Sequence, residues 1–267
     1  MMASPNTIFI TGGGSGMGLT LALRYLGQGK NIAVFDLRFS DEVKAKLEQA
    51  CPATQKLSFH TANVCDGEQL TEEVNQAVNA IGKPQLIIHC AGILLAGLVS
   101  EQSQQEFEKV VSINLFGTRN MVAACLPHLE TDGHIAMISS MAGVTGNYTY
   151  SAYCASKFGV MGLAKVLRME LKPKGIKVSV ICPPEVSTPM VTEEHKSINP
   201  ITLELKLVAG VLTVDEAVNA IMAGIEAKKP IIVPGAKAKL IYFLNRYMPD
   251  FILNSVVDKV IKKGLAK

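Results

Sequence analysis

Two hydrophobic patterns alternate along the chain. Short apolar runs rich in β-branched residues are typical of buried strands, whereas longer stretches with an apolar residue every three or four positions are typical of amphipathic helices. The expected strands are Thr7–Thr11, Ile32–Asp36, Leu57–Thr61, Leu86–Cys90, His134–Ser139, Ile176–Cys182 and Ile231–Val233. The expected helices are Gly18–Leu26, Asp41–Gln49, Glu68–Ala80, Gln104–Leu126, Ala155–Leu171 and Val214–Ala227. This alternation predicts the α/β class, with a doubly wound, seven-stranded parallel sheet covered by helices on both faces.

The sequence shows no internal repeat, low-complexity segment or long linker. We therefore expect one domain over residues 1–235, with its ligand beyond the carboxyl ends of the strands. The character of the chain changes after Pro234, where bulky apolar residues mix with basic ones. Residues 236–267 are accordingly predicted to form a C-terminal extension.

Composition narrows the class of protein. Hydrophobic residues occupy 48% and charged residues 18% of the 267 positions, which is ample for a large core. The net charge of +3 is small and the basic residues are spread along the chain, which argues against nucleic-acid binding. No signal-peptide pattern precedes the first strand, and no stretch approaches about 18 uninterrupted apolar residues. We expect a cytoplasmic protein.

The six cysteines give no sign of a metal site or a disulfide framework. They lie far apart, without a CxxC pair or a matching pair of histidines, at Cys51, Cys65, Cys90, Cys125, Cys154 and Cys182. We expect reduced, buried thiols and no bound metal.

The sequence TGGGSGMG follows the first strand and leads into the first helix. Glycines permit a tight turn and a close backbone approach, and the N–H groups at a helix start attract phosphate. A merely flexible loop is the alternative, but the position between strand and helix favours a Rossmann-type dinucleotide site. The residues expected to contact the cofactor here are Gly12, Gly14, Ser15, Gly16, Met17 and Gly18.

Asp36 ends the second expected strand, about twenty residues beyond the glycines. Its carboxylate can accept hydrogen bonds from both ribose hydroxyls and would repel a 2′-phosphate, so NAD(H) is the preferred cofactor. Arg38 keeps NADP(H) open, since its guanidinium could pair with a phosphate or stack on adenine. A solvated carboxylate at the strand end is the alternative interpretation of Asp36.

Tyr153 and Lys157 lie four residues apart at the start of a helical pattern, on one helix face. A free phenol has a pKa about three units above neutrality, equivalent to about 4 kcal/mol, and a nearby ammonium would stabilise the phenolate. Ser140 lies upstream after an apolar strand and can donate a hydrogen bond to a carbonyl oxygen that gains negative charge. Each residue alone has a structural explanation, but together they predict proton transfer at a ketone or alcohol.

At these residues the sequence resembles the short-chain dehydrogenase/reductase family, from about Thr7 to Pro234. The resemblance rests on TGGGSGMG, HCAG at His89–Gly92, INLFG around Asn114, and the set of Ser140, Tyr153 and Lys157. It implies that Asn114 holds a water that relays protons to Lys157; a helix–helix hydrogen bond is the compatible alternative. It also implies cofactor contacts from Asn63, Val64, Cys90, Ala91, Gly92, Tyr153, Lys157, Pro183, Val186 and Thr188. The family commonly forms homodimers and homotetramers.

The run PPEVSTPMVTEEHKSINP is similar to the 3-ketodihydrosphingosine reductase branch of that family. This similarity implies reduction of an apolar ketone, such as a long-chain 3-keto lipid, or oxidation of the corresponding alcohol. The branch generally uses NADPH, against which Asp36 argues. A 3-oxoacyl thioester reductase or a hydroxysteroid-type dehydrogenase is the alternative, and a non-catalytic cofactor-binding protein is a more distant one. Residues from about 189 to 211 fall where the family places a substrate lid.

The extension beyond Ala236 has the pattern of an amphipathic helix. Its apolar residues are Leu240, Ile241, Phe243, Leu244, Tyr247 and Met248, and its basic residues are Lys237, Lys239, Arg246, Lys259, Lys262, Lys263 and Lys267. Packing against another subunit or the lid is the default expectation for such a helix. Peripheral contact with an anionic membrane, which would help a lipid ketone to enter, is our hypothesis.

Overall fold

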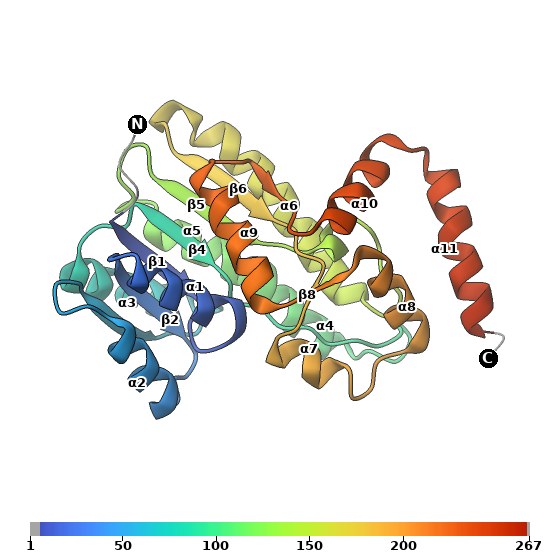
Figure 1. Ribbon diagram of the computed structural model, residues 1–267, viewed down its shortest axis with the longest axis horizontal. Helices are drawn as coiled ribbons and strands as arrows, with labels where there is room; N and C mark the ends of the chain where they lie inside the picture. The colour runs from blue at the N-terminus through green and yellow to red at the C-terminus, as the bar shows by residue number, and fades with distance from the viewer. Residues whose placement is uncertain (1–5, 266–267) are drawn as a thin grey trace.

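A computed structural model describes residues 6–265 and contains the expected seven-stranded parallel sheet (Figure 1). The strand order is β3-β2-β1-β4-β5-β6-β9. The strands are β1 (Thr7–Thr11), β2 (Asn31–Asp36), β3 (Leu57–Thr61), β4 (Leu86–His89), β5 (His134–Ile138), β6 (Lys177–Ile181) and β9 (Ile231–Ile232). The prediction of a doubly wound α/β fold is confirmed.

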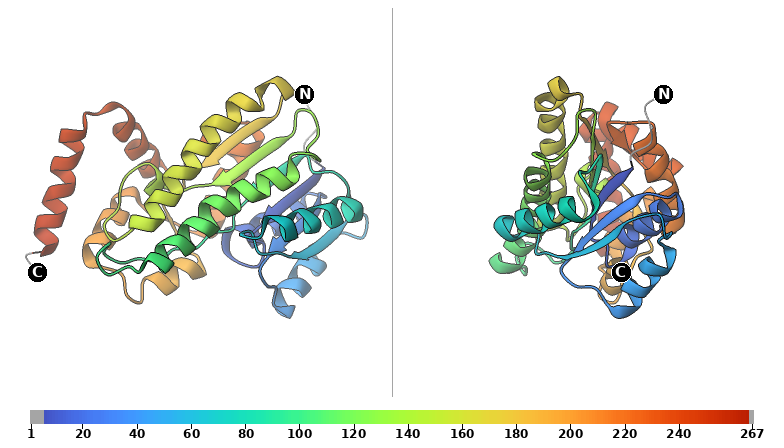
Figure 2. Two further views of the ribbon diagram at one scale, coloured as in Figure 1. Left: turned by 180° about the vertical axis from the view of Figure 1, so that it is seen from behind. Right: turned by 90° about the vertical axis from the view of Figure 1, so that its left-hand side faces the viewer.

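Helices cover both faces of the sheet. The face toward the viewer in Figure 1 carries α1 (Gly16–Gly27) and α9 (Val214–Glu226), with α2 (Asp41–Ala50) beside them. The opposite face, in the left view of Figure 2, carries α3 (Gly67–Ile81), α4 (Gln104–Val111), α5 (Gly117–Cys125) and α6 (Ser151–Glu170). Successive residues of a strand enter opposite cores, so Ile8 packs with the α1 face and Phe9 with the α6 face.

The sheet order reverses at β1, which lies between β2 and β4. In register, Thr11 at the end of β1 is paired with Phe35 of β2 and with His89 of β4. Chain connections leave this point in opposite directions, which opens a crevice at the carboxyl ends of the strands. The glycine loop, Asp36 and the turn after His89 therefore converge there.

The expected helix Gln104–Leu126 is not uniform. It consists of α4, a π-helical turn at Ser112–Phe116 and α5. A π turn accommodates one extra residue, and such turns occur frequently at functional sites. Here the turn carries Asn114, whose side chain is fully buried.

Residues 185–212, which include the expected lid, form two short helices and a small sheet. The helices are α7 (Pro189–Glu194) and α8 (Pro200–Ala209), and β7 (Glu185–Val186) pairs with β8 (Val211–Leu212). The C-terminal extension is two helices rather than one, α10 (Ala236–Tyr247) and α11 (Asp250–Leu265). Pro249 lies between them, and a proline disfavours helical backbone in the residue before it.

The α11 helix extends away from the sheet and meets α8 (Figure 1). A Cβ at Gly264 would lie 2.4 Å from Cγ1 of Ile201, and Lys263 Nζ forms an ion pair with Glu204 at 2.8 Å. Within residues 6–265, none of the helices combines the length and apolar character needed to cross a bilayer. Lys267 and the first five residues lie outside the described part of the chain.

All six cysteines are free thiols, but the expectation that all are buried is wrong. Only Cys125 and Cys182 are buried, and Cys65 is exposed. Cys65 follows β3 in a loop shaped by the Asn63 side chain, which accepts a hydrogen bond from the Cys65 N–H at 3.0 Å, and this loop lies on the surface. Among the described residues, no group of His, Cys, Asp and Glu side chains could hold a metal ion.

Candidate active site

The glycine loop is compressed against its own helix and against the turn after β4. Gly12 has a φ of +68°, and a Cβ at Gly12 would lie 2.9 Å from the Ala91 nitrogen. A Cβ at Gly18 would lie 2.1 Å from the Gly12 carbonyl oxygen. No side chain of the described chain caps the N-terminus of α1 at Ser15. Its first N–H groups are therefore available to an anion, which fits the pyrophosphate of a dinucleotide.

The Thr11 hydroxyl joins this loop to the turn after β4. Its Oγ1 accepts hydrogen bonds from the N–H groups of Cys90 and Ala91 at 3.1 and 3.2 Å, and lies 2.9 Å from Nδ1 of His89. Burial lowers the pKa of His89 to about 3, with a further contribution from Lys157, so the imidazole is neutral. Thr11 and His89 begin two of the motifs quoted from the sequence, but the sequence assigned neither residue a role, since neither carries reaction chemistry.

Asp36 lies at the edge of the crevice, where the structure brings it against the glycine loop. Its Oδ2 accepts a hydrogen bond from the Gly14 N–H at 2.8 Å, and its Oδ1 accepts one from the Arg38 N–H at 3.4 Å. A Cβ at Gly14 would lie 2.8 Å from Oδ2, so only glycine permits this approach. Lone pairs of the carboxylate stay available for the hydroxyls of a ribose.

Asn63 and Val64 follow β3, one strand beyond Asp36. The Ala62 N–H donates to the Asp36 carbonyl at 2.9 Å, which holds this segment beside the crevice. Val64 is 9% exposed and packs against Gly117, whose Cβ would lie 2.6 Å from Cγ2 of Val64. These two expected cofactor contacts therefore lie next to Asp36.

Tyr153, Lys157 and Ser140 lie together. Tyr153 and Lys157 are one turn apart on α6, with Lys157 Nζ 5.6 Å from the centroid of the Tyr153 ring. Ser140 precedes a 3-10 turn at Met141–Gly143, accepts the Ala142 N–H at 3.1 Å and hydrogen-bonds to Tyr153. The Ser139 hydroxyl donates to the Lys157 carbonyl at 2.9 Å, which fixes the end of β5 against α6.

The electrostatics of this trio differ from the expectation drawn from spacing. Burial raises the pKa of Tyr153 to about 12, and the hydrogen bond with Ser140 opposes that rise. Burial lowers the pKa of Lys157 to about 8. The Lys157 ammonium donates to the Ile138 carbonyl at 3.0 Å rather than lying against the phenolic oxygen. Without further positive charge, the phenol is therefore a proton donor.

Asn114 ties the loop after β4 to α6. Its Nδ2 donates to the Ile93 carbonyl at 2.9 Å and to Ser156 Oγ at 3.0 Å, and its Oδ1 accepts the Ile93 N–H at 2.8 Å. A Cβ at Gly92 would lie 3.0 Å from Oδ1 of Asn114 and 3.5 Å from Lys157 Nζ. The helix–helix hydrogen bond anticipated as an alternative is present, and the proton-relay role stays a prediction.

A cavity of about 420 Å³ begins at this trio and extends to the C-terminal helices. Its polar end contains Ser140, Tyr153 and Lys157, and its nearby walls include Met17, Cys90, Gly92, Pro183, Val186 and Thr188. The other end is lined by side chains of the lid and extension, including Met190, Val191, Leu205, Val208, Ile241, Leu244, Leu253, Val257 and Val260. A Cβ at Gly16 would lie 3.5 Å from Cγ2 of Thr188, so the lid segment begins beside the glycine loop.

A largely buried ion-pair network reaches the same cavity, which Glu185 and Lys206 line. Lys206 Nζ lies 2.6 Å from Oε2 of Glu185 and 2.5 Å from Oε2 of Glu194. The side chains of Lys206, Glu185 and Glu194 are 9%, 3% and 4% exposed. Oε1 of Glu185 lies 3.2 Å from Nε2 of His195, and the Tyr150 hydroxyl donates to Glu194. Sequence reasoning missed this network because its members come together only when residues 185–212 fold over the cavity.

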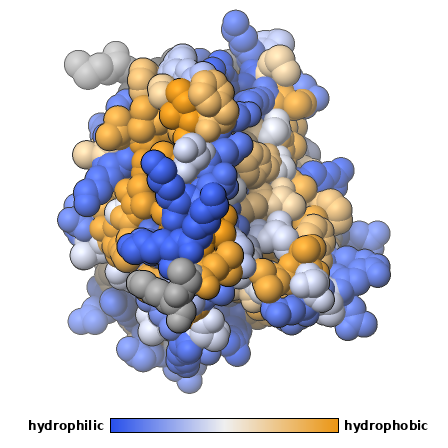
Figure 3. All heavy atoms as spheres, turned by 90° about the vertical axis from the view of Figure 1, so that its right-hand side faces the viewer, coloured by the Kyte–Doolittle hydropathy of each residue, from blue (hydrophilic) through white to orange (hydrophobic). Residues whose placement is uncertain are grey.

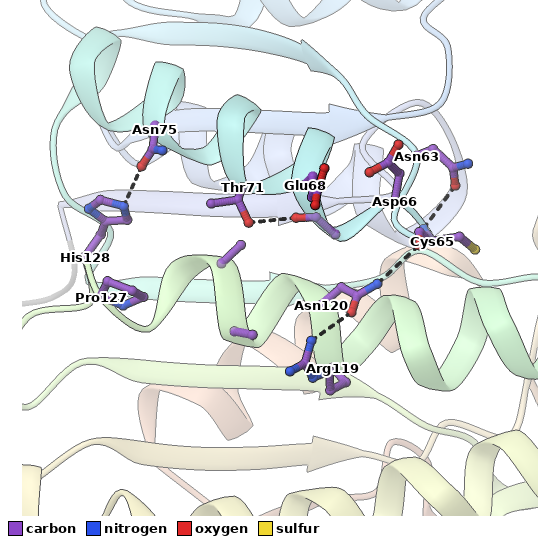
Figure 4. A pocket seen from close by; sticks show the side chains of 13 residues that line it. Asn63, Cys65, Asp66, Glu68, Thr71, Asn75, Arg119, Asn120, Pro127 and His128 are labelled. Carbon is purple, nitrogen blue, oxygen red and sulfur yellow. Dashed lines mark hydrogen bonds between the residues drawn. The ribbon is translucent and has the colours of Figure 1, made fainter.

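A second, larger groove of about 890 Å³ lies elsewhere, between α3 and α5 (Figure 4). Its lining includes Asn63, Thr71, Arg119, Asn120 and His128, several of which hydrogen-bond one another or nearby backbone. None of the predicted catalytic residues lines it. We therefore assign the reaction to the apolar cavity.

The fold and this site define a dinucleotide-dependent oxidoreductase. A family model described as short chain dehydrogenase matches residues 6–199, and the chain belongs to that family. The structure of a short chain dehydrogenase from Mycobacterium paratuberculosis bound to NAD has a TM-score of 0.76 and 25% identity, covering 86% of this chain and 96% of that one. The prediction of a nicotinamide-dependent enzyme of this family is confirmed.

Curated relatives carry more specific names. A 3-dehydrosphinganine reductase of Arabidopsis thaliana is 30% identical over 227 residues, which cover 83% of this chain and 67% of that protein. A 3-ketodihydrosphingosine reductase of Mus musculus is 33% identical over 201 residues, 71% of this chain and 59% of that protein. A 3-oxoacyl-acyl-carrier-protein reductase of Thermotoga maritima is 28% identical over 183 residues, 68% of this chain and 74% of that protein.

Proposed function

We propose that this enzyme reduces the keto group of a long-chain 3-keto lipid, or oxidises the corresponding alcohol. The observation that carries the proposal is the apolar cavity of about 420 Å³ that leads from Ser140 and Tyr153 to the lid and C-terminal helices. An alkyl chain gains about 0.8 kcal/mol for each CH₂ group that such walls remove from water. The names of the sphingolipid-type relatives agree with this substrate.

The chain's own residues supply the acid and the electrostatic stabilisation. A nicotinamide cofactor, when bound, would supply the hydride for reduction, and its oxidised form would add positive charge to the site. Ser140 donates a hydrogen bond to the ketone oxygen as negative charge develops there. Tyr153, protonated at neutral pH because burial raises its pKa to about 12, donates the proton that completes the alcohol. Lys157 supplies positive charge one helical turn away.

NAD(H) is the proposed cofactor. In folds of this type the adenosine ribose of a dinucleotide lies beside the acidic residue at the end of the second strand. Asp36 is that residue here, and its carboxylate accepts hydrogen bonds from the N–H groups of Gly14 and Arg38. A 2′-phosphate would bring two negative charges toward this carboxylate. Arg38 is exposed and is the residue through which NADP(H) would bind instead.

The test is a matrix of initial rates with NADH and NADPH against three ketones. These are 3-ketodihydrosphingosine, an acetoacetyl thioester and a steroid ketone. We expect the highest kcat/KM with the long-chain keto lipid and NADH. A higher value with the thioester would favour the 3-oxoacyl reductase that the Thermotoga relative's name suggests. Absence of turnover with any ketone, in a sample that binds NADH, would overturn the proposal.

We also propose that the C-terminal helices contact an anionic membrane. Leu240, Phe243 and Tyr247 lie on one side of α10 and are 58%, 57% and 65% exposed, and Phe251 at the start of α11 is 74% exposed. Figure 3 shows hydrophobic surface interrupted by hydrophilic side chains on the side of the molecule that carries α11. Exposed apolar side chains beside basic residues suit an interface of acyl chains and anionic headgroups.

A further inference from the structure

The ion-pair network in the cavity carries an imbalance of charge that proton and hydride transfer do not use. Glu185 and Glu194 contribute two carboxylates, whereas Lys206 contributes one ammonium, and His195 is 38% exposed at the edge. Burying a charged group without full compensation costs several kcal/mol. A site that retains such a group in its substrate cavity is suited to a ligand of opposite charge.

One carboxylate oxygen in this network lacks a hydrogen bond. Oε2 of Glu185 is buried and has no hydrogen-bond partner among the described residues, although Lys206 Nζ lies 2.6 Å away. The ammonium and the oxygen attract each other as charges, but their angles do not form a hydrogen bond. Glu185 lines the cavity, so this oxygen can accept a hydrogen bond from a ligand that enters the network.

The network lies close to the proton donor. Tyr150 hydrogen-bonds to Glu194, and its ring lies edge-on to that of Tyr153, with 5.6 Å between centroids. Lys206 Nζ lies 5.7 Å from the centroid of the Tyr150 ring. A ligand atom that meets Glu185 is therefore close to the phenol that faces the ketone.

We propose that Glu185 determines substrate specificity by binding a cationic amino group on the carbon next to the ketone, with Glu194 and Lys206 positioning its carboxylate. This inference rests on the proposed reduction of a long-chain ketone. The amino group would donate to Oε2 of Glu185 and offset the negative charge of the network. Ketones without the amine leave that oxygen unsatisfied, which penalises their binding.

The experiment compares two ketones of equal chain length. One is a long-chain 2-amino-1-hydroxy-3-ketone, and the other carries hydrogen in place of the amine. We expect the unmodified enzyme to favour the amino ketone by about 10- to 100-fold in kcat/KM, mainly through KM. Glu185→Gln should remove most of this preference by lowering kcat/KM for the amino ketone, with less than about a threefold change for the other ketone. Glu185→Asp, which retains the charge, should keep part of the preference.

Glu193→Gln is the matched control. Glu193 is adjacent to Glu194, but its side chain is 74% exposed and pairs with Lys196 outside the cavity, so neither ketone should be affected. NADH binding, measured by fluorescence, shows whether Glu185→Gln is folded.

Equal kcat/KM for the two ketones with the unmodified enzyme would overturn this inference while leaving the proposed function intact. An equal loss for both ketones in folded Glu185→Gln would assign Glu185 a purely structural role and would also overturn it. Failure of the enzyme to reduce either ketone would instead overturn the proposed function.

Discussion

The Lys157 ammonium donates a hydrogen bond to the carbonyl oxygen of Ile138 across 3.0 Å. Ile138 is the last residue of β5 and Lys157 lies in the second turn of α6, so this bond anchors α6 to the central sheet. The side chain is removed from water, and burial lowers its pKa to about 8. Keeping Lys157 charged at neutral pH therefore lowers the free energy of unfolding.

The first prediction concerns the pH dependence of stability. The native Lys157 loses its proton near pH 8, whereas in the unfolded chain it keeps the proton until about pH 10.5. The unfolded state therefore binds more protons between these values, so the contribution of Lys157 to stability rises with pH across that window, by up to about 3 kcal/mol. We would measure the free energy of unfolding in urea for the wild type and for Lys157→Met, without cofactor. The wild-type value should rise relative to that of Lys157→Met between pH 8 and 10.5.

Lys165→Met serves as the comparison, because Lys165 lies on the same helix but is exposed. Its difference from the wild type should stay constant from pH 8 to 10.5. If the difference in free energy of unfolding between the wild type and Lys157→Met is also constant, Lys157 has the same pKa in the native and unfolded states.

The second prediction separates chemistry from cofactor binding. Tyr153→Phe removes the proton donor while keeping the ring that packs edge-on against Tyr150. We expect kcat for ketone reduction to fall by about 10³-fold and the dissociation constant for NADH to change less than about twofold. Stopped-flow rates and fluorescence titration measure the two quantities. Tyr247→Phe, at a ring that is 65% exposed, should behave like the wild type, and retained turnover in Tyr153→Phe would refute the assigned role.

Local sequence patterns predicted the seven strands and the grouping of Ser140, Tyr153 and Lys157, because a parallel sheet places all strand ends at one edge. The spacing of Tyr153 and Lys157 did not predict the charge states of their side chains. The side-chain interval from Tyr153 to Lys157 suggested direct stabilisation of a phenolate, but the ammonium is bonded to Ile138 and burial dominates both pKa values. Burial depends on the whole fold and has no short-range signature.

The ion pairs among residues 185–206 were also not predictable from local sequence. Glu185 and Glu194 stand in the run PPEVSTPMVTEEHKSINP, but neither they nor Lys206 form a motif of reaction chemistry. Their ion pairs form because β7, α7 and α8 fold back over the cavity. The hydrophobic pattern did not predict the π turn at Asn114 either. The buried hydrogen bonds of the Asn114 side chain are to Ile93 and Ser156, which lie in distant elements.

The third prediction tests cofactor choice. Asp36→Ala removes the carboxylate that accepts the Gly14 N–H and would repel a 2′-phosphate. We expect kcat/KM to fall by about tenfold with NADH and to rise with NADPH, so that the ratio shifts by about 10- to 100-fold. Asp41→Ala, at the exposed start of α2, should leave the ratio unchanged. An unchanged ratio in Asp36→Ala would show that another residue, with Arg38 the first candidate, sets the preference.

The fourth prediction concerns the glycine loop. Gly18→Ala would place a Cβ 2.1 Å from the Gly12 carbonyl oxygen, a clash with backbone that the loop can relieve only by moving. We expect weaker NADH binding by at least about tenfold and a loss of about 1–3 kcal/mol in the free energy of unfolding. Gly27→Ala is the control, since no atom lies within 4 Å of its added Cβ, and it should be neutral or slightly stabilising. Equal behaviour of the two variants would contradict the compressed geometry of the loop.

The last prediction concerns membrane contact through α10. Leu240→Ser combined with Phe243→Ser removes two exposed apolar side chains whose insertion among acyl chains is worth about 1.5–3 kcal/mol each. We expect co-sedimentation with vesicles rich in anionic lipid to weaken by at least about tenfold in this variant. Val99→Ser combined with Met169→Ser removes apolar side chains that are 75% and 68% exposed elsewhere on the surface, and should bind like the wild type.

Binding of the wild type should also weaken with added salt, because basic side chains contribute through screened attraction. Equal binding by both double variants would exclude α10 as the contact surface and would favour its packing against a second subunit.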